Sequence, residues 1–79
     1  MMEELKEMYA EKTKEMKEKY ADVINEISAK YNVPVGDAFD MLKAVCRGGD
    51  YADGFEFDKE ELMKDYLELT EISDQIANI

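Results

Sequence analysis

The sequence predicts a single all-α domain over residues 1–79, a small three-helix bundle in an up-down-up arrangement. Three observations favour this fold. Apolar residues recur every three or four positions in three separate segments, and a proline and a pair of glycines stand between these segments. The chain has 79 residues, of which 46% are apolar and 38% charged, so it can build one core but not two.

The first helix is predicted over residues 3–31. Placed at 100° per residue, its apolar side chains fall within about 60° of one another. Their spacing alternates between four and three residues, as in the seam of a left-handed helix pair. The polar Thr13 interrupts this stripe and needs either a hydrogen-bond partner or contact with water. The stripe consists of Leu5, Tyr9, Met16, Tyr20, Val23 and Ile27.

Pro34 ends the first helix and suits the first turn of a second one, predicted over residues 34–47. Gly48 and Gly49 supply a left-handed stop after it. A loop over residues 48–57 leads to a third helix over 58–77, which begins with Asp58 as N-cap and Glu61 as its reciprocal partner. Side chains of all three helices are predicted to be buried together: Tyr20, Ile27, Phe39, Leu42, Leu62 and Leu69.

The first predicted helix is longer than either of the others. At 1.5 Å per residue it measures about 43 Å, against about 21 and 29 Å, so one of its ends should extend beyond the helices that could cover it. We therefore expect a self-association surface at the N-terminus and a homodimer. This surface would consist of Met1, Met2, Leu5 and Met8.

The composition excludes most catalytic and metal chemistry. Histidine is absent and Cys46 is the one cysteine, which excludes histidine acid–base catalysis, Cys/His zinc sites and intrachain disulfides. The acidic loop also departs from the calcium-binding EF-hand, because a register with Gly54 in the sixth place puts Gly49 and Tyr51 in the first and third. We expect no enzymatic activity, no cofactor and no metal, with Cys46 acting as a small core residue.

The net charge of −10 opposes direct binding to nucleic acid and favours a basic protein partner. Residues 50–79 hold ten acidic residues and two lysines, and no basic residue follows Lys64. The later carboxylates of this half are therefore expected to stand unneutralised. On the first helix Glu4, Glu7, Glu11, Glu15, Glu18 and Asp22 form an acidic ridge, which we interpret as a solvated face balanced by neighbouring lysines.

The loop before the third helix interleaves aromatic and acidic residues. Its aromatic side chains are either anchors at a protein interface or, alternatively, Tyr51 and Phe55 cover the core and Phe57 packs across the cap of the third helix. The loop and the third helix together supply the predicted partner-binding residues: Asp50, Tyr51, Asp53, Phe55, Glu56, Asp65, Glu68, Glu71 and Asp74.

These observations predict a non-enzymatic acidic module that occupies a basic surface of a partner protein. Such surfaces often hold DNA or RNA, so the partner can be a nucleic-acid-binding protein and the chain a nucleic-acid mimic or inhibitor of the phage type, by analogy. The alternative is a structural or assembly subunit that self-associates through its long first helix. The N-terminus resembles no signal peptide and no segment is apolar enough for a membrane span, so we expect a cytoplasmic protein that does not bind membranes.

Overall fold

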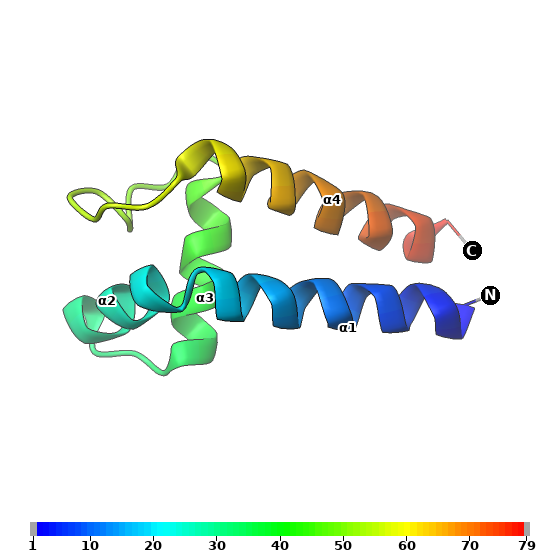
Figure 1. The fold of residues 1–79 in the computed structure, drawn as a ribbon, viewed down its shortest axis with the longest axis horizontal. Helices are drawn as coiled ribbons and strands as arrows, with labels where there is room; N and C mark the ends of the chain where they lie inside the picture. Colours follow the sequence, from blue (N-terminus) through cyan, green and yellow to red (C-terminus); the bar gives the residue numbers. More distant parts are fainter. Residues whose placement is uncertain (1, 79) are drawn as a thin grey trace.

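The computed structural model describes residues 2–78 and contains four α-helices and no β-strand in that range (Figure 1). They are α1 (Met2–Lys19), α2 (Ala21–Tyr31), α3 (Val35–Val45) and α4 (Lys59–Ala77). The all-α class is as predicted, but the number of helices is four and not three. The difference arises in the first predicted helix, which is broken at Tyr20.

The break at Tyr20 is a change of helix direction. Tyr20 has φ −107° and ψ 22°, outside helical geometry. Hydrogen bonds from Tyr20 N–H to Met16 C=O (2.9 Å) and from Ile24 N–H to Tyr20 C=O (3.0 Å) still run across it. α1 packs mainly on α4, whereas α2 packs mainly on α3. A straight helix could not make both contacts, so the chain bends where the packing partner changes.

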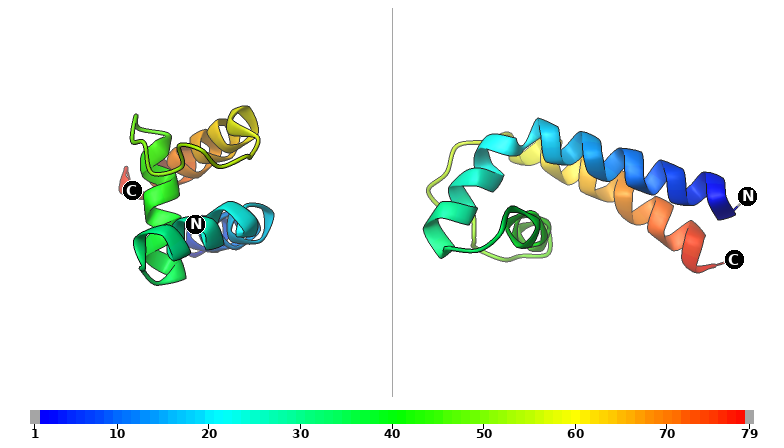
Figure 2. Two further views of the ribbon diagram at one scale, coloured as in Figure 1. Left: turned by 90° about the vertical axis from the view of Figure 1, so that its left-hand side faces the viewer. Right: turned by 90° about the horizontal axis from the view of Figure 1, so that it is seen from below.

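α1 and α4 pack side by side and antiparallel, with the two chain ends at the same end of the molecule (Figure 1). We call this pair of helices the hairpin, although α2 and α3 lie between them in the sequence. α3 does not run alongside this hairpin but crosses behind it (Figures 1 and 2). The predicted up-down-up arrangement is therefore wrong, since it would make the first and last helices parallel. With 11 residues, or about 16 Å, α3 is too short to return the chain along the hairpin.

The predicted boundaries of α3 and α4 are confirmed to within two residues. α3 follows Pro34 and is followed by Gly48, whose φ of +97° lies in the left-handed region that glycine adopts without strain. Asp58 caps α4, because its side chain accepts a hydrogen bond from Glu61 N–H at 3.0 Å. The reciprocal half of the capping box is absent, since the Glu61 carboxylate binds Lys19 instead.

The core lies where the hairpin meets α2 and α3. The six predicted core residues are all buried in one cluster, together with Met16, Val23, Ile24, Ala38, Val45 and Ala52. The Thr13 hydroxyl, identified in the sequence as needing a partner, is buried without one in the described part of the chain. An unpaired buried hydroxyl of this kind costs about 1–3 kcal/mol.

The expected overhang of the first helix does not form. α1 has 18 residues and α4 has 19, so α4 accompanies α1 along its whole length. Met2 and Leu5 are half-buried, whereas the side chain of Met8 is 49% exposed. Met1 lies outside the described residues.

Two leucines of α4 test this packing. Leu69 is 2% exposed, so Leu69→Ala should reduce the free energy of unfolding by about 2–5 kcal/mol. Leu67 is 56% exposed, and Leu67→Ala should change it by less than about 0.5 kcal/mol. Urea unfolding of both variants measures the difference. Equal losses from the two substitutions would contradict the orientation of α4.

Candidate interaction surface

A buried carboxylate lies at the junction of the hairpin and the Tyr20 bend. Asp65 of α4 is 5% exposed. Its Oδ1 accepts a hydrogen bond from Lys12 Nζ at 2.7 Å, and its Oδ2 accepts from Lys19 Nζ at 3.0 Å and from the Tyr20 hydroxyl at 2.5 Å. Lys12 and Lys19 of α1 contact the same side chain, because they are two helical turns apart on the side that faces α4.

The surroundings of Asp65 keep it ionised. Burial alone would raise the pKa of Asp65, but hydrogen bonds from Lys12, Tyr20 and Lys19 outweigh this effect and lower the pKa to about 2. Burial and the hydrogen bond to Asp65 both raise the pKa of Tyr20, which stays protonated and donates. Asp65 is therefore an internal counter-ion for two lysines.

The expectation that Asp65 stands unneutralised is wrong, since its side chain is buried and paired with Lys12 and Lys19. Carboxylates that lack basic neighbours along the sequence find them in the fold, because the antiparallel hairpin brings lysines of α1 close to α4. Two further carboxylates share these lysines: Glu61 lies 2.6 Å from Lys19 Nζ, and Glu68 lies 2.7 Å from Lys12 Nζ.

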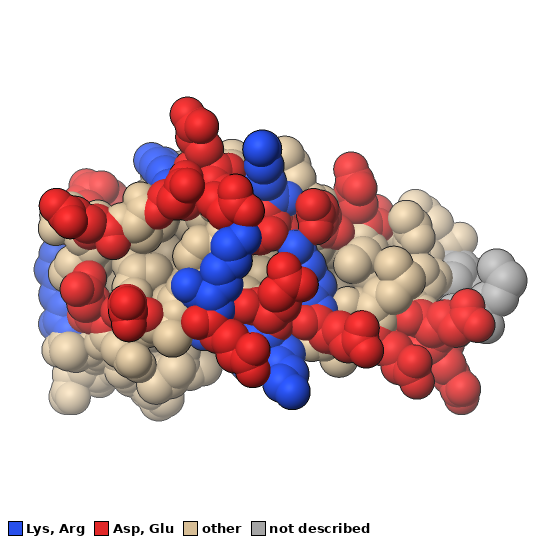
Figure 3. Space-filling model, viewed as in Figure 1, with Lys and Arg blue, Asp and Glu red and all other residues tan. Residues whose placement is uncertain are grey.

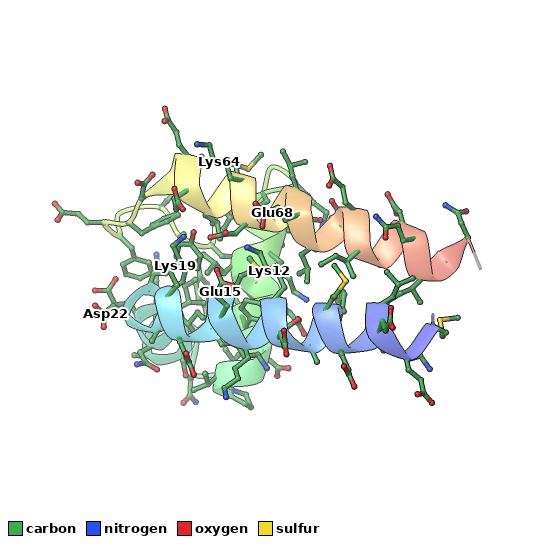
Figure 4. All side chains as sticks on the ribbon, turned by 45° about the vertical axis from the view of Figure 1, so that its right-hand side comes forward. Lys12, Glu15, Lys19, Asp22, Lys64 and Glu68 are labelled. Carbon is green, nitrogen blue, oxygen red and sulfur yellow. The ribbon has the colours of Figure 1, made fainter. Side chains whose placement is uncertain are left out.

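The same pairing turns the acidic ridge of α1 and a row of acids on α4 toward one side of the hairpin. Lys12 contacts Glu15 of the ridge (3.7 Å) as well as Glu68 of the row, so the ridge and the row lie on either side of Lys12. Figure 4 shows Lys12, Glu15, Lys19 and Glu68 between the two helices. We define the acidic face as the ridge with the α4 row: Glu4, Glu7, Glu11, Glu15, Glu18, Asp22, Glu61, Glu68 and Glu71.

The acidic face is the side of the hairpin that points away from α3. α3 lies behind the hairpin in the view of Figure 1, and Figure 3 shows the opposite, front side, where carboxylates outnumber lysines. Eight of the nine carboxylates are exposed and Glu61 is half-buried. Three of the lysines near the ridge have partners outside it, since Lys12 and Lys19 bind Asp65 and Lys17 lies over the Phe39 ring at 5.4 Å. Of these, Lys12 also lies 3.7 Å from Glu15 of the ridge.

The aromatic residues of the loop have different environments. Phe55 and Phe57 are half-buried against the core, and Tyr51, which is 36% exposed, packs edge-on against Tyr31 with ring centroids 5.7 Å apart. Ala52, which follows Tyr51 in the loop, is buried. This arrangement agrees with a structural role for Phe55 and Phe57 and leaves Tyr51 as the most accessible aromatic ring of the loop.

The predicted partner-binding residues do not form one compact patch. Asp50, Asp53 and Glu56 are exposed in the loop, at the start of α4, whereas Glu71 and Asp74 are exposed near its end. Asp58 and Glu71 alone are separated by about 20 Å along the helix axis. The α1 ridge, which we interpreted from the sequence as a solvated face, is the part that lies beside the α4 row.

Cys46 is half-buried against the core, and burial raises the pKa of its thiol, although Arg47 and Lys59 oppose this shift. Within residues 2–78, no three Cys, Asp or Glu side chains are grouped so as to hold a metal ion. None of the helices in this range combines the length and apolar composition of a membrane span.

The chain has no match among protein-family models, curated proteins or solved structures. Its function must therefore be argued from the chemistry of its own surfaces.

The role of Asp65 can be tested through pH. Asp65→Asn should reduce the free energy of unfolding at neutral pH by about 3 kcal/mol, because it leaves two lysines without their buried counter-ion. The folded pKa of about 2 lies below the unfolded value of 3.8, so the stabilisation is complete above about pH 4 and is lost as the pH falls toward 2. Unfolding curves at several pH values should show the gap between the parent and the variant narrowing by about 2 kcal/mol over that interval.

Glu68→Gln is the control for this experiment. Glu68 contacts the same lysine, but its side chain is 63% exposed, so its loss should cost less than about 1 kcal/mol. If the free energies of unfolding of the parent protein and of Asp65→Asn differ by the same amount down to pH 2, Asp65 is not the ionised group.

Proposed function

We propose that the chain is a non-enzymatic binding protein whose acidic face occupies a basic surface of a partner protein. The observation that carries this proposal is the alignment of the α1 ridge with the α4 row, which gathers nine carboxylates around Lys12 and Lys19 on one side of the hairpin. Like charges this close repel one another and lower stability, so their gathering favours a role in recognition over a purely solubilising one.

The partner in this proposal has a basic surface of the kind that holds DNA or RNA, and the chain acts as a nucleic-acid mimic. Two features support this finer assignment. The ridge acids from Glu4 to Glu18 follow one another at three or four residues, or about 5 Å, along α1, which is about 27 Å long. Asp22, the last of the ridge, lies just after the bend. A linear array of negative charge is also the feature that proteins recognise in a phosphate backbone.

Charge reversal tests the proposal once a partner has been captured from the native host and identified by mass spectrometry. Glu11→Lys and Glu71→Lys each change the net charge of the acidic face by +2 and should slow association several-fold at low salt. Added salt should slow association of the parent protein in the same way. Surface plasmon resonance at two salt concentrations measures both effects.

Asp37→Lys is the matched control, because it makes the same change of charge at an exposed position of α3, outside the acidic face. Association that is slowed as much by Asp37→Lys as by Glu11→Lys would mean that only net charge matters. Binding that ignores salt would overturn the proposal altogether. Tyr51→Ala reports on the loop, since loss of an aromatic anchor should speed dissociation without slowing association.

Self-association is a second candidate function, favoured by the end of the hairpin that carries the chain termini. Leu5 of α1 and Ile72 and Ile76 of α4 are only half-buried there, because two helices cannot enclose a core between them. Leu5→Ser with Met8→Ser should weaken a dimer without unfolding the chain, and the dimer should be insensitive to salt. Sedimentation velocity over a range of concentrations decides this, and a parent protein that stays monomeric throughout excludes it.

A further inference from the structure

A small pocket lies on the other side of the hairpin, in the corner where the back of α1 and α4 meets the end of α3. Its volume is about 170 Å³. Two cations, Lys43 and Arg47, line it together with four hydroxyl side chains, Tyr9, Tyr66, Thr70 and Ser73, above the buried Leu69. The right-hand view of Figure 2 shows the corner, with α3 nearly end-on beside the hairpin.

No carboxylate lines this pocket, although the protein carries a net charge of −10. By contrast, the groove beside Tyr20 is lined by four: Asp22, Glu56, Asp58 and Glu61. The nearest acid with a defined contact is Asp40, whose exposed carboxylate lies 3.3 Å from Lys43 Nζ. Asp40 neutralises part of the charge of Lys43 but is not itself a lining residue, and no such ion pair engages Arg47 within residues 2–78.

Most of the polar groups that line the pocket can donate a hydrogen bond. Arg47 Nη1 donates to the Tyr66 oxygen at 2.9 Å, which leaves the Tyr66 hydroxyl hydrogen and the other guanidinium hydrogens available. The Tyr9 and Ser73 hydroxyls bind no other residue of the described chain, whereas the Thr70 hydroxyl already donates to Leu67 C=O. Four side chains, Tyr9, Arg47, Tyr66 and Ser73, can thus donate hydrogen bonds into one small space. Lys43 adds positive charge beside it, although its Nζ lies over the Phe39 ring at 4.9 Å and near Asp40.

We propose that this pocket binds a phosphate group, either free or as the monoester of a small molecule. A phosphate offers several acceptor oxygens in a tetrahedral arrangement, which suits donors that converge from α1, α3 and α4 better than the two coplanar oxygens of a carboxylate. The pocket holds several times the roughly 30 Å³ of one water. None of the residues that line the pocket belongs to the acidic face.

An apolar groove continues from the pocket and offers space for the rest of a monoester. It has a volume of about 730 Å³, shares Tyr9 with the pocket and follows α1 past Ala10 and Thr13. The stems of Lys14 and Lys17 flank it, and Glu18 of the acidic face is also a lining residue. An aromatic or aliphatic group attached to the phosphate would lie along this groove, and inorganic phosphate would leave it empty.

The test is a titration of the full-length, ¹⁵N-labelled chain with inorganic phosphate and, separately, with phenyl phosphate. Ionic strength is held near 0.15 M with sodium chloride, so that the repulsion from the acidic face is screened beyond about 8 Å. Amide shifts should saturate at millimolar phosphate and be confined to residues around Lys43, Arg47, Tyr66 and Ser73. Tighter binding of phenyl phosphate identifies a monoester as the ligand, and equal binding identifies free phosphate.

Variants separate the site from general attraction of anions to lysines. Arg47→Gln should weaken binding about tenfold, since it removes a charged hydrogen-bond donor. Ser73→Ala, which changes no charge, should weaken it about threefold and serves as the second variant if Arg47→Gln fails to fold. Lys64→Gln removes a lysine outside the pocket and should have no effect.

Three results would overturn the proposal. One is a set of shifts that grow linearly up to the highest concentration, and another is a set of shifts spread evenly over lysines outside the pocket. The third is an affinity that neither Arg47→Gln nor Ser73→Ala reduces.

Discussion

The arrangement of the molecule depends on the carboxylate of Asp65. One oxygen binds Lys12, and the other binds Lys19 and the Tyr20 hydroxyl, so a single side chain of α4 holds the second half of α1 and the bend that follows. An apolar seam with repeats of three and four residues tolerates a slip of one turn, or about 5.4 Å. Such a slip would separate a buried charge from a lysine, which is far more costly than an imperfect apolar contact. Asp65 therefore defines the register of the hairpin.

The sequence predicts those features that depend on neighbouring residues. Asp58, Pro34 and Gly48 mark helix ends through local geometry, and the six core residues follow from helical periodicity. The bend at Tyr20 carries no glycine or proline and could not be predicted, because it results from packing against two different helices. Periodicity also shows that two helices pack without showing in which direction they run, which is why the antiparallel hairpin was missed.

The candidate surfaces depend on that direction. In the sequence, lysines lie next to the acids of the α1 ridge and can balance them. In the fold, Lys12 and Lys19 bind Asp65, and the ridge becomes part of an acidic face. On the back of the hairpin the same pairing brings Tyr9 of α1 close to Tyr66 and Ser73 of α4, beside two cations of α3 and its following turn. The molecule thus separates its charge by face, although the sequence shows only an excess of acid.

The hairpin also has a consequence for the order of folding. The pair Lys12 and Asp65 lies 53 residues apart in the chain, whereas only residues 32–34 separate α2 from α3. Loop closure costs about 0.6 kcal/mol for each doubling of length, and contacts between distant residues form more slowly than local ones. We therefore expect α2 and α3 to pair first and α4 to dock on α1 last. Both sides of the hairpin would then be completed in this final step, so a chain arrested before it presents neither of them.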